Sequence, residues 1–208
     1  MTGEPMLRFI KNDGGIMGLV ISQIALIVAT GILIASIFSL VFLNDWQRAA
    51  ELQNIATSFS TMVEGMDARF FENTTGFCFP DKDYVYNVSM STEYIVVSAQ
   101  GNLDSSLSVK ERFLVKLWPQ NKSSVWIGGA GLHHYLKTNF GNSGNMSDPI
   151  QMGDIDNVNF YLNEEWNNTV GTSASYPFYI LTNRTVYIDK AYVYSANGGK
   201  QAFIFVYQ

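Results

Sequence analysis

Hydrophobic residues are concentrated near the beginning of the chain, where residues 16–43 form a stretch without any charge, IMGLVISQIALIVATGILIASIFSLVFL. A helix of this length extends about 42 Å, whereas the hydrocarbon layer of a bilayer is about 30 Å thick. The stretch is longer than the apolar core of a secretory signal peptide, and Asn44 and Asp45 stand where a small-residue cleavage site would be expected. We therefore expect a retained helix that is surrounded by lipid or by other apolar helices.

Beyond residue 43 the hydrophobic residues recur at alternating spacings of three and four, which is the period of an amphipathic helix. The members of this stripe are Leu52, Ile55, Phe59, Met62 and Met66. We expect residues 44–72 to continue the stalk as an amphipathic helix that ends near the turn-like residues 73–76. The stripe must be buried, either on a sheet of the same domain or in a coiled coil with a second copy.

After residue 72 the dominant period changes to two, which is typical of half-buried strands. Strands are expected at residues 84–90, 94–98, 107–117, 157–162, 178–182, 185–194 and 203–206, with Asn87 on a solvent face. Asn197-Gly198-Gly199 predicts a tight hairpin turn between the last two strands, and residues 137–154 an exposed loop. The pattern indicates an α+β protein in which one long N-terminal helix, spanning a membrane and extending outside it, precedes an antiparallel β-sandwich domain over residues 73–208.

Charge and cysteine content exclude two classes of protein. The 208 residues carry a formal net charge of −5, without a basic run, so a nucleic-acid partner is not expected. Cys78 is the single cysteine, so an intrachain disulfide is impossible. Its role is left open between a small apolar side chain and an intermolecular bridge.

The flanking charges predict an orientation for the apolar helix. Arg8 and Lys11 precede it, whereas only Arg48 occurs in the first twenty residues after it, which favours a cytoplasmic N-terminus and an extracellular C-terminal domain. The sequons agree with this orientation because all of them lie beyond the helix, and we expect surface glycans on some of them. The sequons begin at Asn73, Asn87, Asn121, Asn145, Asn167 and Asn183.

The junction before the apolar stretch reads Asp13-Gly14-Gly15-Ile16-Met17-Gly18-Leu19. With the aliphatic run that follows, it resembles the cleavage region of archaellins and other archaeal type IV pilin-like proteins. The resemblance covers residues 8–43 and implies that a prepilin-type peptidase cuts between Gly15 and Ile16, removing a cytoplasmic leader of residues 1–15 and retaining the helix. One feature departs from the family pattern, because Gly14 stands where Lys or Arg is common. An uncut signal anchor is the alternative.

Candidate residues for catalysis or metal binding are few. Adjacent His133 and His134 would point to opposite faces of a strand, and the glycines at 128, 129 and 131 lack the Gly-Lys-Ser/Thr ending of a phosphate loop. Asp154, Asp156 and Glu165 have the spacing of the first, third and twelfth positions of a calcium loop, but Val158 occupies a ligand position. We expect an Asp/Asn-rich turn there, and a protein without enzymatic activity, cofactor or metal.

Within the apolar helix, Gly31, Ala35 and Ser39 lie four apart on one face, which permits the close approach of another helix. Gln23 is the most polar group of the stretch and would prefer a hydrogen-bonding neighbour to lipid. The favoured hypothesis is a pilin-like cell-surface protein whose residues 16–43 pack with other copies or related subunits in a filament or envelope assembly. The alternative is a permanently anchored single-pass protein whose exterior domain binds a partner or cell-wall component.

Overall fold

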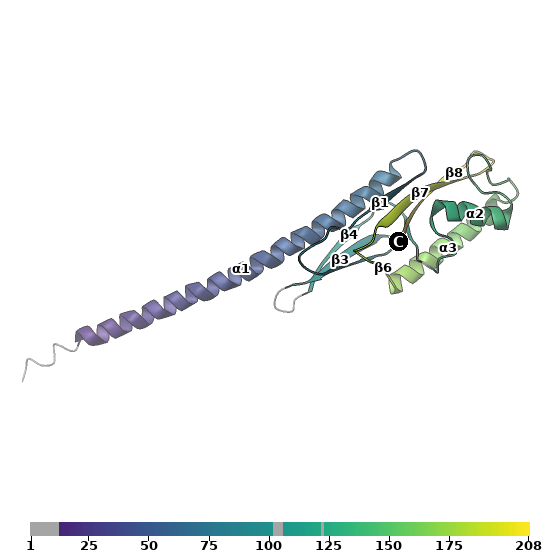
Figure 1. Ribbon diagram of the computed structural model, residues 1–208. Helices are drawn as coiled ribbons and strands as arrows, with labels where there is room; N and C mark the ends of the chain where they lie inside the picture. The colour runs from purple at the N-terminus through teal and green to yellow at the C-terminus, as the bar shows by residue number, and fades with distance from the viewer. Residues whose placement is uncertain (1–12, 102–105, 122) are drawn as a thin grey trace, which may run out of the picture. The chain divides into compact units, whose positions relative to one another are not determined.

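A computed structural model of the chain describes residues 13–101, 106–121 and 123–208, with side chains from residue 17 onward. The chain divides into two compact units, Met1–Gln47 and Arg48–Gln208. Most of the expected leader, including Arg8 and Lys11, lies outside the described residues. The fold is α+β, with a long N-terminal helix followed by two sheets, as expected, and by two further helices that were not expected (Figure 1).

Helix α1 extends over Asp13–Asp67 and has two parts of different character. In the first unit, the described side chains of residues 17–40 are all exposed. In the second unit, the predicted stripe is buried except for the half-buried Met62, with Leu52 and Phe59 completely inaccessible and Met66 1% exposed. The stripe packs against both sheets of its own domain, which confirms the first of the two packing modes considered for it.

The eight strands in the described part of the chain form two four-stranded sheets. The first sheet has the order β1-β7-β8-β5, built from β1 (Asn73–Phe77), β7 (Val186–Tyr194), β8 (Lys200–Tyr207) and β5 (Leu117–Pro119). The second sheet has the order β4-β3-β2-β6, built from β4 (Ser106–Arg112), β3 (Tyr94–Gln100), β2 (Tyr86–Met90) and β6 (Phe178–Ile180). All pairs are antiparallel except β5 with β8.

The first sheet has a hydrophobic core on each of its faces. Val186 and Ile188 of β7 belong to the core that contains α1 and the second sheet. Ala191 and Val193 belong to a second core, formed with helices α2 (Gly128–Phe140) and α3 (Ile155–Ser175). Because neighbouring side chains of a strand point to opposite faces, one strand contributes to both cores. Its almost unbroken burial follows from this position.

Helices α2 and α3 correct the prediction for this part of the chain. The strand expected at residues 157–162 is wrong, because these residues lie within α3. Val158, Phe160 and Leu162 gave an alternating pattern, but Phe160 is 70% exposed while Val158 and Leu162 are buried. The spacing of four that separates the two buried residues is helical. Likewise, the expected loop at 137–154 begins only after Phe140, and the two histidines lie in α2 rather than in a strand.

Other boundaries also differ from the predicted ones, and residues 73–76, which were expected to form a turn, lie in β1. The strand expected at 107–117 is divided, because β4 ends at Arg112 and β5 begins at Leu117 in the other sheet. Helix α1 ends at Asp67, before the expected position 72, because Asn73 already pairs with Lys190 in the first sheet. The predicted final hairpin is confirmed, and Gly198 adopts the positive φ of 84° that the turn requires.

Candidate functional site

The apolar part of α1 exposes the long hydrophobic stretch that was identified in the sequence. Its large side chains over residues 17–40 are exposed by 46% to 71%, and among the described residues it is the one helix long and apolar enough to cross a membrane. This assignment depends on its length and composition. An apolar surface of this extent is characteristic of a segment that is buried in lipid or against other chains.

Polar side chains in this segment are mostly satisfied within the helix. The hydroxyls of Ser22, Thr30 and Ser36 donate hydrogen bonds to the carbonyls of Leu19, Leu26 and Ile32 at 2.8–2.9 Å. Such bonds lower the cost of placing a hydroxyl in an apolar environment. The segment is therefore compatible with an environment that lacks water.

The predicted packing residues Gln23, Gly31, Ala35 and Ser39 are all exposed. A Cβ added at Gly31 would have no heavy atom within 4 Å, so the chain itself does not require a glycine there. The predicted processing residues Gly15 and Ile16 lie in the first turns of α1, while the preceding residues 1–12 are outside the described part of the chain.

The sequon asparagines are all at least partly accessible. Asn87, Asn121, Asn167 and Asn183 are exposed, whereas Asn73 and Asn145 are half-buried. Asn87 lies on the outer face of β2, as predicted. Asn167 lies within α3 rather than in a surface loop.

The glycines at the start of α2 have a structural explanation. The backbone N–H of Gly128 donates to Gln120 Oε1 at 2.7 Å, and that of Gly129 donates to Asp189 Oδ2 at 2.6 Å. A Cβ on Gly129 would lie 2.5 Å from the Cβ of Ala191, so the glycine permits close packing of α2 on β7. The helix terminus that could hold a phosphate is thus already bound by a carboxylate and an amide of the chain itself.

The buried Lys190 binds the C-terminal end of α1. Its ammonium group donates to the carbonyls of Asp67 and Arg69, the latter at 2.7 Å, and lies 3.7 Å from Asp67 Oδ1. These carbonyls lie at the C-terminus of α1, where the helix dipole favours a positive charge. The two buried charges of β7, Asp189 and Lys190, therefore have a structural role, because each binds a helix end.

The loop after α2 is organised by Asp148. This carboxylate accepts hydrogen bonds from Lys137, Asn142 and Ser143, which hold the pKa of Asp148 well below its ordinary value, with the Lys137 contact as the largest cause. His133 Nδ1 is hydrogen-bonded to the Ser143 carbonyl at 2.8 Å. His133 therefore fastens the loop to α2.

The described residues contain no group of three or more His, Cys, Asp or Glu side chains arranged to hold a metal ion. Asp154 is the N-cap of α3, Asp156 lies in its first turn and Glu165 lies further along it. The spacing that matches a calcium loop therefore extends about 16 Å along a helix instead of closing around an ion. Cys78 is exposed, with Sγ 3.4 Å from Thr185 Oγ1.

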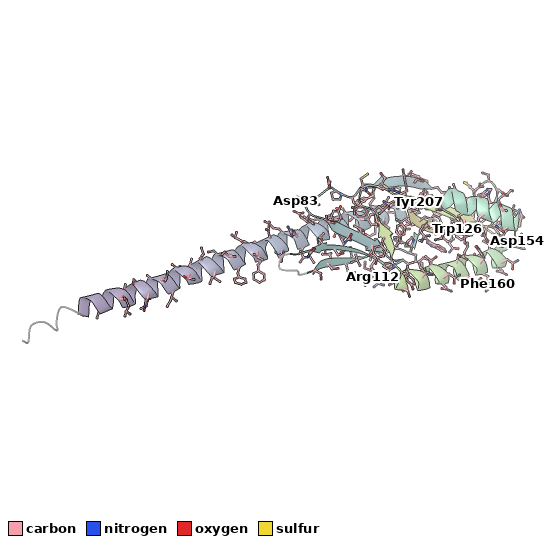
Figure 2. The ribbon with its side chains drawn as sticks, turned by 60° about the horizontal axis from the view of Figure 1, so that its bottom comes forward. Asp83, Arg112, Trp126, Asp154, Phe160 and Tyr207 are labelled. Atoms are coloured by element: carbon pink, nitrogen blue, oxygen red, sulfur yellow. The ribbon has the colours of Figure 1, made fainter. Side chains whose placement is uncertain are left out.

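Sequence reasoning missed a cavity of about 520 Å³ in the second unit. It lies between the residues at and after β5, the second half of α3 and the start of β6. Figure 2 shows Trp126 on the inner side of α3 and Phe160 on its outer side. A signal for it was present, because Glu165, Thr169 and Thr172 continue the helical spacing of the buried Val158 and Leu162 with polar residues. Because residues 157–162 were expected to form a strand, this continuous helical face was not predicted.

Comparison with protein-family models, with curated proteins and with solved structures finds no match to this chain.

Proposed function

We propose that this chain is a non-enzymatic, pilin-like subunit of the cell surface. Residues 16–43 anchor the precursor in the membrane and then pack with the corresponding helices of other copies or related subunits. The observation that carries the proposal is the division of α1, whose first part exposes an uncharged apolar surface while its second part forms the core of a folded domain. In a subunit of this kind, one helix serves as the assembly element in its first part and as part of the folded head in its second part.

The driving force for assembly is the removal of apolar side chains from water or lipid into a packed helical core. Full burial of one large aliphatic side chain contributes about 1.5–3 kcal/mol relative to exposure in water. Between lipid and a helical core the gain comes instead from close packing, which small residues such as Gly31 and Ala35 permit. The carboxamide of Gln23 makes no hydrogen bond to another described residue and provides a polar contact for a neighbouring helix.

The remainder of the chain is proposed as a sandwich-like exterior head. Both sheets pack on the C-terminal part of α1, and the accessible sequon asparagines provide attachment points for glycans. In this proposal Arg8 and Lys11 keep the N-terminus in the cytoplasm, where a prepilin-type peptidase cuts before Ile16, and the resemblance to archaeal pilin-like proteins supports that step.

The decisive experiment combines N-terminal mass spectrometry with imaging of the cell envelope. We expect the mature chain to begin at Ile16 and to occur in filaments or ordered envelope assemblies. The double variant Gly31→Leu and Ala35→Leu should insert into membranes normally but fail to assemble, because both positions are exposed in the single chain. The control Ala29→Leu adds a leucine on the opposite face. Normal assemblies from the double variant would overturn the proposed packing.

A permanently anchored protein with a partner-binding head is the second candidate. The cavity beside α3 favours it, because a purely structural head has no need of one. This candidate predicts that the mature protein retains Met1 and occurs as single molecules in the membrane. The same mass spectrum therefore separates the two candidates.

A further inference from the structure

The cavity beside α3 has the composition of a ligand site. Its walls come from the edge strand β5 and the residues after it, from the second half of α3 and from the edge strand β6. Its volume of about 520 Å³ lies in the range of sites for small molecules. The cavity is thus formed where the edges of both sheets meet one helix.

The face of α3 that lines the cavity is polar, although it continues the buried face of the helix. Val158 and Leu162 are buried in the second core, whereas the next residues that line the cavity from this side of the helix are Glu165, Asn168, Thr169 and Thr172. Thr169 donates a hydrogen bond to the Glu165 carbonyl, and Asn168 and Thr172 are exposed. The amide and hydroxyl groups of Asn168 and Thr172 are therefore available to a ligand.

Aromatic side chains provide another part of the surface. Trp118 and Trp126 are 6% and 7% exposed and lie at the inner wall, while Tyr176 and Tyr179 are more than two-thirds exposed and lie at the mouth. The indole Nε1 of Trp126 is buried without a hydrogen-bond partner among the described residues. Because this nitrogen is inaccessible to solvent, the indole contributes apolar ring surface to the inner wall rather than a hydrogen-bond donor to a ligand.

One carboxylate lies in the wall of the cavity. Glu165 is the only charged side chain among the described lining residues, and a carboxylate repels phosphate and other acidic groups. Flat aromatic rings beside hydroxyls, a carboxamide and one carboxylate match a ligand that has an apolar C–H face and a rim of neutral hydroxyl groups. Sugar rings have this chemistry.

An added peptide strand fits the cavity less well. Pro119 ends β5 and Pro177 immediately precedes β6, so both edges lack a backbone N–H donor at this point. Strand addition depends on such donors. The edges that meet here are therefore protected against pairing.

We propose that this cavity binds a neutral oligosaccharide. The sugar stacks on Tyr179 and Tyr176 at the mouth and exchanges hydrogen bonds with Asn168 and Thr172. Its source is either a separate surface polysaccharide or an N-glycan of this chain, because the sequon residue Asn121 lies at the rim. The inference is independent of filament assembly, so either can fail without the other.

The test is calorimetric titration of the full chain, made in a host without N-glycosylation and held in a detergent without sugar headgroups. The probes are maltotriose, mannotriose and chitotriose, with galacturonic acid trimer as the anionic comparison and a proline-free hexapeptide as the strand-forming one. We expect saturable binding of at least one neutral trisaccharide and weaker binding of the acidic one. Failure of all three neutral sugars, or tighter binding of the acid or the peptide, would overturn the proposal.

Variants identify the site. Tyr179→Ala and Thr172→Val should each weaken binding about tenfold, the effect of losing roughly 1.4 kcal/mol of contact. Asn168→Ala removes an exposed carboxamide of the α3 wall, so it should weaken binding without lowering stability. The matched control Phe160→Ala removes an exposed ring on the outer face of α3 and should leave the affinity unchanged. Equal affinities in all four variants would contradict the proposed location.

The source of the sugar is separated by expression in a glycosylating host. If the glycan of Asn121 fills the cavity, the glycosylated chain should bind no added sugar and Ser123→Ala should restore binding. If the ligand is a separate polysaccharide, the glycosylated chain and the Ser123→Ala variant should bind equally. Either result supports a sugar site, whereas a glycosylated chain and a variant that both fail to bind would contradict it.

Discussion

Asp189 and Lys190, which are adjacent in β7, bind two helix ends of opposite polarity on opposite faces of the same sheet. The Asp189 carboxylate accepts the N–H of Gly129 at the N-terminus of α2, and the Lys190 ammonium binds the carbonyls of Asp67 and Arg69 at the C-terminus of α1. Each charge therefore opposes the partial charge of the helix end that it contacts. One dipeptide fixes the position of a helix in each of the two cores.

Replacing either charge should destabilise the second unit. Lys190→Met leaves the carbonyls at the end of α1 without their donor and should cost about 2–4 kcal/mol, and Asp189→Asn should cost about 1–3 kcal/mol. Denaturant titration of the full chain in detergent, followed by circular dichroism, measures both values. The control Lys200→Met removes an exposed lysine of the same hairpin and should cost less than about 1 kcal/mol. Equal effects of Lys190→Met and the control would contradict the structural role of the buried ammonium.

Two glycine-to-alanine substitutions should change the stability of the chain in opposite directions. Gly129→Ala places a Cβ 2.5 Å from that of Ala191 and should destabilise the chain by about 1–3 kcal/mol, because the α2–β7 contact must open. Gly171→Ala in α3 meets no atom within 4 Å and should stabilise the chain by up to about 1 kcal/mol through helix propensity. Thermal unfolding of the two variants in parallel provides the measurement. A neutral Gly129→Ala would show that α2 does not pack this closely.

Phe59 is expected to be the most sensitive position of the amphipathic part of α1. Its ring is completely buried and lies 5.2 Å from the ring of Phe77 and 5.6 Å from that of Phe79, centroid to centroid. Phe59→Ala should reduce the free energy of unfolding by about 3–5 kcal/mol, because it leaves a large void among aromatic rings. The control Phe71→Ala removes a ring that is 62% exposed and should change stability by about 0.5 kcal/mol or less. A small effect at Phe59 would indicate that the helix does not form the core.

Tyr84 predicts a loss of stability at alkaline pH. Burial, and secondarily its hydrogen bond to Glu51 Oε2 at 3.0 Å, raise the pKa of Tyr84 to about 12 from an ordinary 10. Because the folded state holds the phenolic proton more tightly than the unfolded state does, this contribution is complete below pH 10 and is lost as the pH rises towards 12. The difference between the phenolate absorbance titrations of the wild type and Tyr84→Phe isolates this group. An ordinary pKa in that difference curve would contradict both the burial of the phenol and its contact with Glu51.

The sequence by itself determined the elements whose pattern is local. The uncharged residues 16–43 had to form a long apolar helix, and the stripe from Leu52 to Met66 had to be buried because its period admits one apolar face. The turn at Gly198 joined the last two strands for a similarly local reason, namely the positive φ that glycine adopts without strain.

Only the tertiary structure decided what depends on contacts between distant residues. In the sequence, Asp189 and Lys190 resemble exposed charges in a strand, and their roles require helix ends 60 and 123 positions away. The pattern at 157–162 fitted strand and helix alike until the second core selected the face of Val158 and Leu162. The cavity beside α3 is lined by polar residues that follow the buried face of this helix and by the edge strands of both sheets. The place where these edges meet depends on the tertiary fold, and no local sequence period predicts it.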